Sequence, residues 1–334
     1  MAGELVSPTP ALRGSARRTA ALRLLRRRLI QAVPLMLGVV IINFCLIQMA
    51  PGSFLELMTA ENQVSDPATV ALLRKTYGLD DPVWMQLLKY IWALLHFDFG
   101  FSYRQNMPVI QAIWIHLPAT VLLMVSSIAL AISIGVAAGV VASMKVRTFW
   151  DSLVSVAAMF FYAAPSFWLG IMMIVLFSVK LGWLPASGYV SPREDLMQSL
   201  ATTIMPAFVL GNAIAAVLMR HTRSAMLQVL GQDYVRTARA KGLAEKVVVV
   251  KHALRNAAVP IVTLGALEFG QLLSGAVLTE QVFTIPGFGK LIVDAVFNRD
   301  YLVVQGVVLV TATVYVSLNL LADVAYILLN PRLR

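Results

Sequence analysis

Residues 117–143 read LPATVLLMVSSIALAISIGVAAGVVAS, a run of 27 residues without a charged side chain. As a helix it would be about 40 Å long at 1.5 Å per residue, which exceeds the ~30 Å hydrocarbon core of a bilayer. Prolines at 34, 165 and 206 are expected kink points within similar stretches elsewhere. Five further predominantly apolar stretches bring the total to six: Leu29–Ala50, Leu153–Val179, Leu200–Met219, Val259–Phe283 and Val303–Leu329. The sequence therefore predicts an all-α integral membrane protein with six transmembrane helices.

The overall composition supports the same class. Of the 334 residues, 59% are hydrophobic and 13% are charged, and the mean hydropathy is +0.77. A soluble domain usually carries about 25% charged residues, so a soluble protein is excluded. The single cysteine, Cys45, lies within the first apolar stretch. It has no partner for an intrachain disulfide, and we interpret it as a small packing residue.

The distribution of Lys and Arg predicts the orientation in the membrane. Basic residues concentrate before Leu29, after the second apolar stretch, between the fourth and fifth stretches, and at the C-terminus. Because such residues are enriched on the cytoplasmic side, both termini are predicted to be cytoplasmic. Residues 1–28 then form a cytoplasmic basic segment ahead of a six-span domain of residues 29–334. The net charge of +10 indicates contact with anionic membrane lipid rather than with nucleic acid.

The first external loop is long, covering about residues 51–116 between the first two spans. Its pattern predicts a helix from Asp66 to Tyr77, ended by Gly78, and a second helix from Pro82 to about Leu95. This region is expected to act either as a lid over the outer face of the bundle or as a docking surface for an external partner. The sequence leaves both interpretations open.

A cytoplasmic loop of about residues 220–258 separates the fourth and fifth spans and is rich in Lys and Arg. Asp233 is expected to be the N-cap of a short helix and Gly242 to end it in the left-handed conformation. The helix, ~12 Å long, would carry Tyr234, Ala238 and Lys241 on one face, with Arg236, Arg239 and Ala240 beside them. Because so short a helix is marginal by itself, the pattern predicts a docking partner on the cytoplasmic side.

Polar side chains within the spans are candidates for a solute path, since burying them in hydrocarbon is costly. The candidates are Asn212 in the fourth span, and Glu268 and Gln271 in the fifth. For Glu268, a structural carboxyl that hydrogen-bonds a neighbouring helix is an equal alternative. Asn43 and Gln48 are expected to form interhelical hydrogen bonds. Gly135 and Gly139, four residues apart, favour close helix packing.

Several catalytic patterns are absent from the sequence. It contains no G-x-x-x-x-G-K-[ST] phosphate loop, no G-x-S-x-G elbow and no H-E-x-x-H motif. Its four histidines lack a His or Cys neighbour at zinc-site spacing. No catalytic or metal site is therefore predicted. Active transport by this chain would need an ion gradient or a separate ATPase.

Nearly the whole chain after residue 28 resembles a known family. The resemblance rests on short segments that occur in the family's order: Ala50-Pro51-Gly52, Tyr77-Gly78-Leu79-Asp80 with Pro82, Asp98-Phe99-Gly100-Phe101-Ser102, Leu117-Pro118-Ala119-Thr120, Pro165-Ser166-Phe167-Trp168-Leu169-Gly170, Leu181-Gly182-Trp183-Leu184-Pro185, Ile285-Pro286-Gly287-Phe288-Gly289, Asn298-Arg299-Asp300-Tyr301 and Asn330-Pro331-Arg332. In these the chain resembles the permease subunits of bacterial ABC importers, specifically the first (B-type) permease of the dipeptide/oligopeptide/nickel branch.

The resemblance implies a type I ABC importer permease fold in the bacterial cytoplasmic (inner) membrane. It implies as partners a second homologous permease, an external solute-binding protein and two cytoplasmic ATPase subunits, which bind ATP and Mg. No cofactor is expected in this chain. Di- or oligopeptides are the expected solute, with a nickel chelate, glutathione and oligosaccharides left open. An ion-coupled secondary transporter that works without an ATPase is the alternative, and a non-transporting scaffold is a second one.

The family's cytoplasmic loop carries a Glu-Ala-Ala signature followed four residues later by glycine. Here Gly242 matches the glycine and Ala238 the second alanine, whereas Arg236 and Thr237 replace the first two signature residues. By resemblance, this segment is the coupling helix that contacts an ATPase. The residues to which the resemblance assigns this coupling are Asp233, Tyr234, Arg236, Thr237, Ala238, Arg239, Ala240, Lys241 and Gly242.

Overall fold

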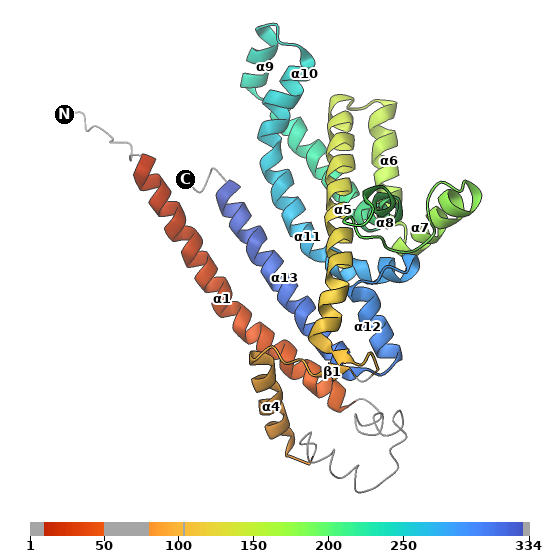
Figure 1. The fold of residues 1–334 in the computed structure, drawn as a ribbon. Helices are drawn as coiled ribbons and strands as arrows, with labels where there is room; N and C mark the ends of the chain where they lie inside the picture. Colours follow the sequence, from red (N-terminus) through yellow and green to blue (C-terminus); the bar gives the residue numbers. More distant parts are fainter. Residues whose placement is uncertain (1–9, 50–79, 103, 330–334) are drawn as a thin grey trace, which may run out of the picture.

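The computed structural model describes residues 10–49, 80–102 and 104–329, and these are mostly helical (Figure 1). The long helices are α1 (Pro10–Gln48), α5 (Val109–Met144), α8 (Leu196–Leu230), α11 (Arg255–Phe283) and α13 (Tyr301–Leu329). Shorter elements are α4 (Val83–Leu95), α6 (Phe149–Ala163), α7 (Ser166–Met173), α9 (Asp233–Ala240), α10 (Glu245–Val247), α12 (Phe288–Phe297) and two π-helices, η1 (Ile174–Lys180) and η2 (Val248–Leu254). Strands β1 (Phe101–Ser102) and β2 (Met107–Pro108) pair antiparallel just before α5.

The described residues contain up to six membrane-spanning units. Four helices are long and apolar enough to cross by themselves: Arg26–Gln48, Val109–Met144, Leu196–Leu230 and Tyr301–Leu321. Two further units are bent pairs, Phe149–Ala163 with Ser166–Lys180 and Leu267–Phe283 with Phe288–Phe297. With each bent pair counted as one span, the arrangement agrees with the predicted all-α membrane protein.

The third predicted span, Leu153–Val179, bends at Pro165, where a kink was expected. The chain bends by 106° between Phe149–Ala163 and Ser166–Lys180. Ala164 is extended, with φ −67° and ψ 129°, because the ring of Pro165 disfavours the α conformation in the residue before it. The expected kink is therefore a full break, and the segment forms two short helices, α6 and α7.

The centre of the bundle is the contact between α5 and α8, where glycines let the two backbones approach closely. An added Cβ at Gly135 would lie 2.6 Å from the carbonyl oxygen of Ala215, and one at Gly139 would lie 2.6 Å from that of Met219. From the other helix, a Cβ at Gly211 would lie 2.5 Å from the carbonyl oxygen of Ser127. The predicted close packing at Gly135 and Gly139 is confirmed.

Helix α1 lies on the outside of the bundle, held by polar contacts to α13 and α4. The amide Nδ2 of Asn43 donates to the carbonyl oxygen of Gln305 at 3.2 Å, and Nε2 of Gln48 donates to Oε1 of Gln86 at 2.9 Å. Both predicted interhelical hydrogen bonds are thus confirmed. Nearer the start of α1, Arg28 forms a 2.8 Å ion pair with Asp323 of α13.

The external region is described only in part. Helix α4 confirms the predicted helix from Pro82 to about Leu95, whereas the helix expected over Asp66–Tyr77 lies outside the described residues. Figure 1 shows α4, β1 and α12 toward one end of the molecule. The beginning of α1, the end of α13 and the α9–α10 pair lie toward the other end. This arrangement agrees with the prediction that the chain enters and leaves the bundle on the same side as the 220–258 loop.

Candidate functional site

The short helix predicted in the cytoplasmic loop exists as α9, the eight residues Asp233–Ala240. Its N-cap is Gln232 and not Asp233, which is the first helical residue. The carboxylate of Asp233 still favours the positive end of the helix dipole, and it lies 3.8 Å from Nη1 of Arg236. The expected end is confirmed, because Gly242 has a φ of +76° and its N–H donates to the carbonyl oxygen of Arg239.

One face of α9 packs against its own chain. Val235 is fully buried and Ala238 is 5% exposed, and both pack on Val248 of η2. Ala238 was expected on an outward face with Tyr234 and Lys241, and this expectation is wrong. The helix turns its small side chains inward, since only a short residue at 238 lets α9 lie close to η2.

An ion pair ties α9 to α10. Arg239 donates from Nε and Nη2 to the two carboxylate oxygens of Glu245, at 3.1 Å and 2.7 Å. This hydrogen-bonded contact lowers the pKa of Glu245 and raises the pKa of Arg239. The bidentate geometry fixes the orientation of the two helices more firmly than a single contact would.

The outward surface of this tip combines charge with apolar area. The exposed residues of α9 and the segment after it include Asp233, Tyr234, Arg236, Thr237, Arg239, Ala240 and Lys241, together with Leu243 and Val247. The hydroxyl of Thr237 is used within the helix, where it donates to the carbonyl oxygen of Asp233 at 2.9 Å. A surface of this mixed kind, on a short anchored helix at one end of the molecule, is suited to docking a second protein.

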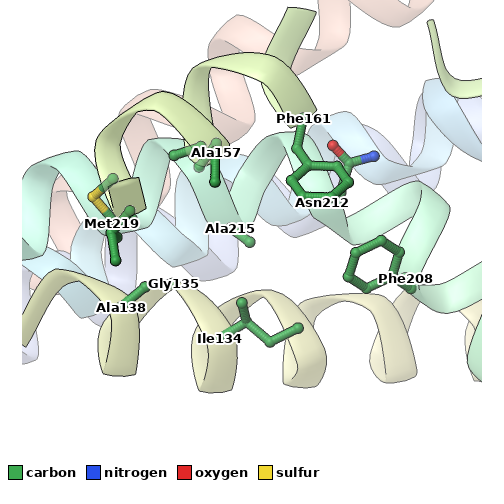
Figure 2. Close-up of a pocket in the computed structure, with 12 residues that line it drawn as sticks. Ile134, Gly135, Ala138, Ala157, Phe161, Phe208, Asn212, Ala215 and Met219 are labelled. Atoms are coloured by element: carbon green, nitrogen blue, oxygen red, sulfur yellow. The ribbon is translucent and has the colours of Figure 1, made fainter. Parts of the chain in front are cut away.

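Asn212 lies near the middle of α8, 6% exposed. Its Nδ2 donates to the carbonyl oxygen of Val209 at 2.8 Å, whereas its Oδ1 has no hydrogen-bond partner among the described residues. The side chain borders a pocket of about 230 Å³ whose lining comes from α5, α6 and α8 (Figure 2).

Glu268 and Gln271 both lie on α11. Glu268 is half-buried, and Gln271 is exposed on the same side as Ser274 and Leu278. The residues that line the Asn212 pocket come from other helices. The structure therefore places the three path candidates in two separate environments instead of one.

Sequence reasoning missed a second acidic residue of α11, Glu280. Its side chain is fully buried. Oε1 accepts a 2.7 Å hydrogen bond from the hydroxyl of Thr120, and the carboxylate also accepts from the backbone N–H groups of Gly289 and Lys290. These two amides belong to the first turn of α12, so Glu280 caps that helix from the preceding one.

The Glu280 contacts explain the Ile285-Pro286-Gly287-Phe288-Gly289 segment. An added Cβ at Gly287 would lie 2.2 Å from Oε1 of Glu280, and one at Gly289 would lie 2.3 Å from the Cα of Val277. The segment therefore permits the 72° bend between α11 and α12, with the carboxylate fitted into it. Glu280 could have been selected from the sequence on the argument that was used for Glu268. In both cases a charged side chain in a membrane span is costly to bury.

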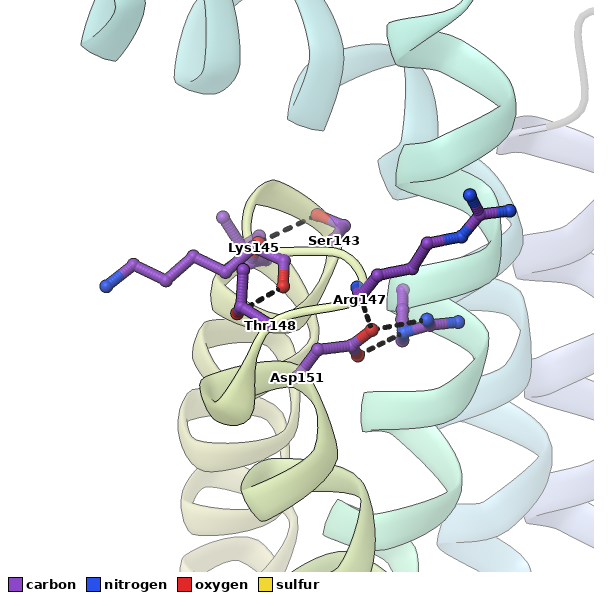
Figure 3. A network of polar contacts seen from close by, with 7 residues as sticks. Ser143, Lys145, Arg147, Thr148 and Asp151 are labelled. Atoms are coloured by element: carbon purple, nitrogen blue, oxygen red, sulfur yellow. Dashed lines mark hydrogen bonds and ion pairs between the residues drawn. The ribbon is translucent and has the colours of Figure 1, made fainter.

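A further polar contact lies at the opposite end of the bundle, where Asp151 of α6 is 6% exposed. Its two carboxylate oxygens accept from Nε and Nη2 of Arg223 of α8, each at 2.8 Å, and one also accepts from the backbone N–H of Arg147 (Figure 3). Sequence reasoning did not select Asp151, although an acid at the start of an apolar stretch is itself a signal. The contact holds the beginning of α6 against α8.

Comparison with known proteins identifies the family. Residues 131–334 match the family described as the binding-protein-dependent transport system inner membrane component. The chain belongs to this family. Residues 21–124 match its companion, the N-terminal part of the membrane component of binding-protein-dependent transport systems.

Two curated relatives are similar over almost their whole length. The dipeptide transport system permease protein DppB of Escherichia coli (strain K12) is 40% identical over 336 residues, which covers 94% of this chain and 99% of the relative. The protein of the same name from Alkalihalophilus pseudofirmus is 37% identical over 328 residues, covering 92% of this chain and 98% of the relative. The resemblance to an ABC importer permease of the dipeptide/oligopeptide branch is confirmed, and with it a multi-pass protein of the inner membrane.

Proposed function

We propose that this chain and a second homologous permease together form the path by which di- or oligopeptides cross the bacterial cytoplasmic membrane. The family is a component of binding-protein-dependent transport, so an external solute-binding protein delivers the peptide to the outer face. The relatives named as dipeptide permeases support peptides as the solute. Members of this family serve as transport subunits, so ATP and Mg are bound by two partner ATPase subunits.

The observation that carries the proposal is the anchored helix α9. It lies between α8 and η2, and η2 continues directly into α11. Val235 and Ala238 fix α9 to η2, and the Arg239–Glu245 ion pair fixes it to α10. A displacement of α9 by an ATPase is therefore transmitted to two long helices of the bundle. Rigid-body rocking of the two permeases then changes access from one side of the membrane to the other.

The path itself is proposed to run along the uncovered face of α11. Gln271 and Ser274 are exposed there and Glu268 is half-buried nearby, which gives a membrane helix a partly polar face. Such a face is costly in contact with lipid and suits a hydrated passage between two permeases. Both termini and the α9–α10 tip lie on the cytoplasmic side in this arrangement.

Purification of the tagged chain from its native membrane in mild detergent tests the proposal. We expect a second six-span permease and two ATPase subunits to copurify. Recovery of this chain without an ATPase, under conditions that keep a control ABC complex intact, would instead favour an ion-coupled carrier. Glu268 would then be the first residue to replace.

A matched pair of glycine variants tests the role of α9. Gly242 and Gly182 both have positive φ angles, +76° and +63°, and an added Cβ meets nothing within 4 Å at either position. Valine imposes similar backbone strain at both, but only Gly242→Val alters the end of α9. We expect Gly242→Val to lose ATPase copurification and Gly182→Val to retain it. Equal retention by both variants would refute a docking role for α9.

A further inference from the structure

The segment of residues 233–255, which contains α9, α10 and η2, is strongly basic. It holds six Lys and Arg side chains and two carboxylates, so its net charge is +4. One of the carboxylates, that of Glu245, is already engaged in the ion pair with Arg239. Four cations are exposed and form no ion pair with another residue that the structure describes: Lys241, Lys246, Lys251 and Arg255. Because like charges in one short segment repel one another, the segment favours an anionic partner.

Lipid headgroups are too distant to be the partner of the charges on α9 and α10. The first charged residue of α8 is Arg220, and the helix then continues unbroken to Leu230, ten residues farther on. This length is about 15 Å at 1.5 Å per residue, roughly two Debye lengths at physiological ionic strength, and the potential of a membrane surface falls off within one. Figure 1 shows α9 and α10 beyond the turn that joins α5 to α6. The charges there complement a macromolecule rather than the membrane.

The outward face of α9 carries two cations around a centre of small side chains. Thr237 and Ala240 are exposed on the side of the helix that faces away from η2. At about 100° per residue, Arg236 and Lys241 flank them. The Arg236 side chain is 74% exposed, and the carboxylate that lies 3.8 Å from its Nη1, that of Asp233, is 98% exposed. So open an ion pair contributes little, and Arg236 stays available to a partner.

We propose that α9 docks into an acidic groove of the partner ATPase, in which carboxylates contact Arg236 and Lys241. The inference rests on the proposed function for the ATPase as the partner, and it adds the charge of the docking surface. The family's signature has glutamate at the position of Arg236, so the charge that this chain presents there is reversed. Such a reversal selects between partners, because like charges brought together across an interface are strongly unfavourable. An ATPase whose groove is basic at this point is therefore rejected.

Charge reversal at Arg236 tests the groove. The intact importer complex is immobilised through a tag on this chain in nanodiscs of phosphatidylcholine, whose headgroups carry no net charge, and the retained ATPase is measured at increasing KCl. We expect Arg236→Glu to release the ATPase about tenfold faster than the unaltered chain, and Arg236→Lys to retain it. The packing of α9 on η2 and its ion pair with α10 do not involve Arg236, so the helix persists in both variants. Arg193→Glu is the matched control, because Arg193 is exposed before the other end of α8 and the change in charge is the same.

The outcomes separate the groove from the proposed function. Equal retention of the ATPase by Arg236→Glu and Arg193→Glu would overturn the acidic groove and leave the proposed function standing. A loss that appears only in nanodiscs of anionic phosphatidylglycerol would assign the cation to lipid and overturn the groove as well. If the unaltered complex holds no ATPase even at low salt, the proposed function itself fails and the groove fails with it.

Carbodiimide cross-linking tests the same contact without a change of charge. The reagent joins a lysine amine to a carboxylate as an amide, with loss of water and no spacer, so it couples only groups that are in contact. In the intact complex we expect Lys241 to be linked to an Asp or Glu of the ATPase. Lys241→Arg, which keeps the charge, should hold the ATPase but lose this link. The 2.9 Å ion pair of Lys290 with Asp294 is the internal control, and its link in the absence of one from Lys241 would refute the proposed contact.

Discussion

At the scale of single residues, Gly211 determines how closely α8 approaches α5. A Cβ there would lie 2.5 Å from the carbonyl oxygen of Ser127, a backbone atom that cannot rotate away. We expect Gly211→Ala to lower the free energy of unfolding by about 1–3 kcal/mol, as overpacking does. Gly265→Ala is the control, because a Cβ at Gly265 meets nothing within 4 Å. Thermal unfolding of the detergent-solubilised protein compares them, and equal midpoints would contradict the packing argument.

Glu280 is a residue of a different kind, a buried carboxylate surrounded by hydrogen-bond donors, and its replacement tests the role of those donors. In Glu280→Gln, an amide NH₂ replaces one of the oxygens that receive the Thr120 hydroxyl and the Lys290 N–H. If the amide oxygen keeps the backbone contact, the NH₂ faces the Thr120 hydroxyl, which already accepts from the N–H of Phe288. The hydroxyl proton then loses its acceptor, and we expect a loss of stability of about 1–3 kcal/mol. Glu268→Gln, at a half-buried position of the same helix, should change the unfolding midpoint little. The capping role would be rejected if the two variants behaved alike.

Sequence reasoning succeeded at residues whose environment depends on one helix pair. Asn43 and Gln48 formed the expected interhelical hydrogen bonds because a polar side chain in a span needs a nearby partner. It missed Glu280, because the donors to its carboxylate become available only when the chain bends between α11 and α12. Asn212 was selected because it is a polar residue in a span. The pocket beside it could not be predicted, because it depends on how α6 packs against α5 and α8, and no local sequence pattern indicates that packing.

At the scale of elements, the pairing of α9 with α10 should depend on pH. Hydrogen bonding to Arg239 lowers the pKa of Glu245, so this ion pair contributes stability above the unfolded-state pKa of about 4.3. That contribution is lost as the pH falls through the lowered pKa of the folded protein. We expect the protection of the α9 amides, taken relative to the intrinsic exchange rate at each pH, to fall on acidification below about pH 4.3. In Glu245→Gln, this protection should already be lower at neutral pH and should vary less with pH. An unchanged pH dependence of the protection would contradict the role of this ion pair.

The same segment shows what a pattern can predict about an element. Gly242 was correctly expected to end α9, because its left-handed conformation follows from local sterics. The inward face was misassigned, because an eight-residue helix makes barely two turns and several of its faces carry small residues. In the structure the buried face of α9 is the one that carries Val235 and Ala238, because these two side chains pack on Val248. The bend at Ala164 similarly converts one predicted span into two helices, although Pro165 marked the place.

At the scale of the whole molecule, the apolar composition predicted the membrane class, and the described helices agree with it. The chain by itself leaves much apolar surface uncovered, including Phe149 and Met159 on α6 and Leu267 and Leu278 on α11. Lipid can cover a purely apolar surface such as that of α6, but α11 also exposes the polar residues Gln271 and Ser274. A face that combines both characters is better satisfied by a second permease and a hydrated path than by lipid alone.

The orientation of the whole chain follows from its basic residues and can be measured with the chain's own chemistry. The sequence holds one cysteine, Cys45, so Cys45→Ala provides a background for single-cysteine labelling. Arg193 and Lys241 are both exposed. Arg193 lies just before the long helix α8, and Lys241 follows α9, which lies beyond the other end of α8. Because Lys and Arg are enriched on the cytoplasmic side, a membrane-impermeant maleimide applied to spheroplasts should label Arg193→Cys and not Lys241→Cys. Inside-out vesicles stripped of peripheral subunits should give the reverse pattern. Labelling of Lys241→Cys from outside would place α9 beyond the reach of any cytoplasmic ATPase, and the coupling role would have to be abandoned together with the orientation.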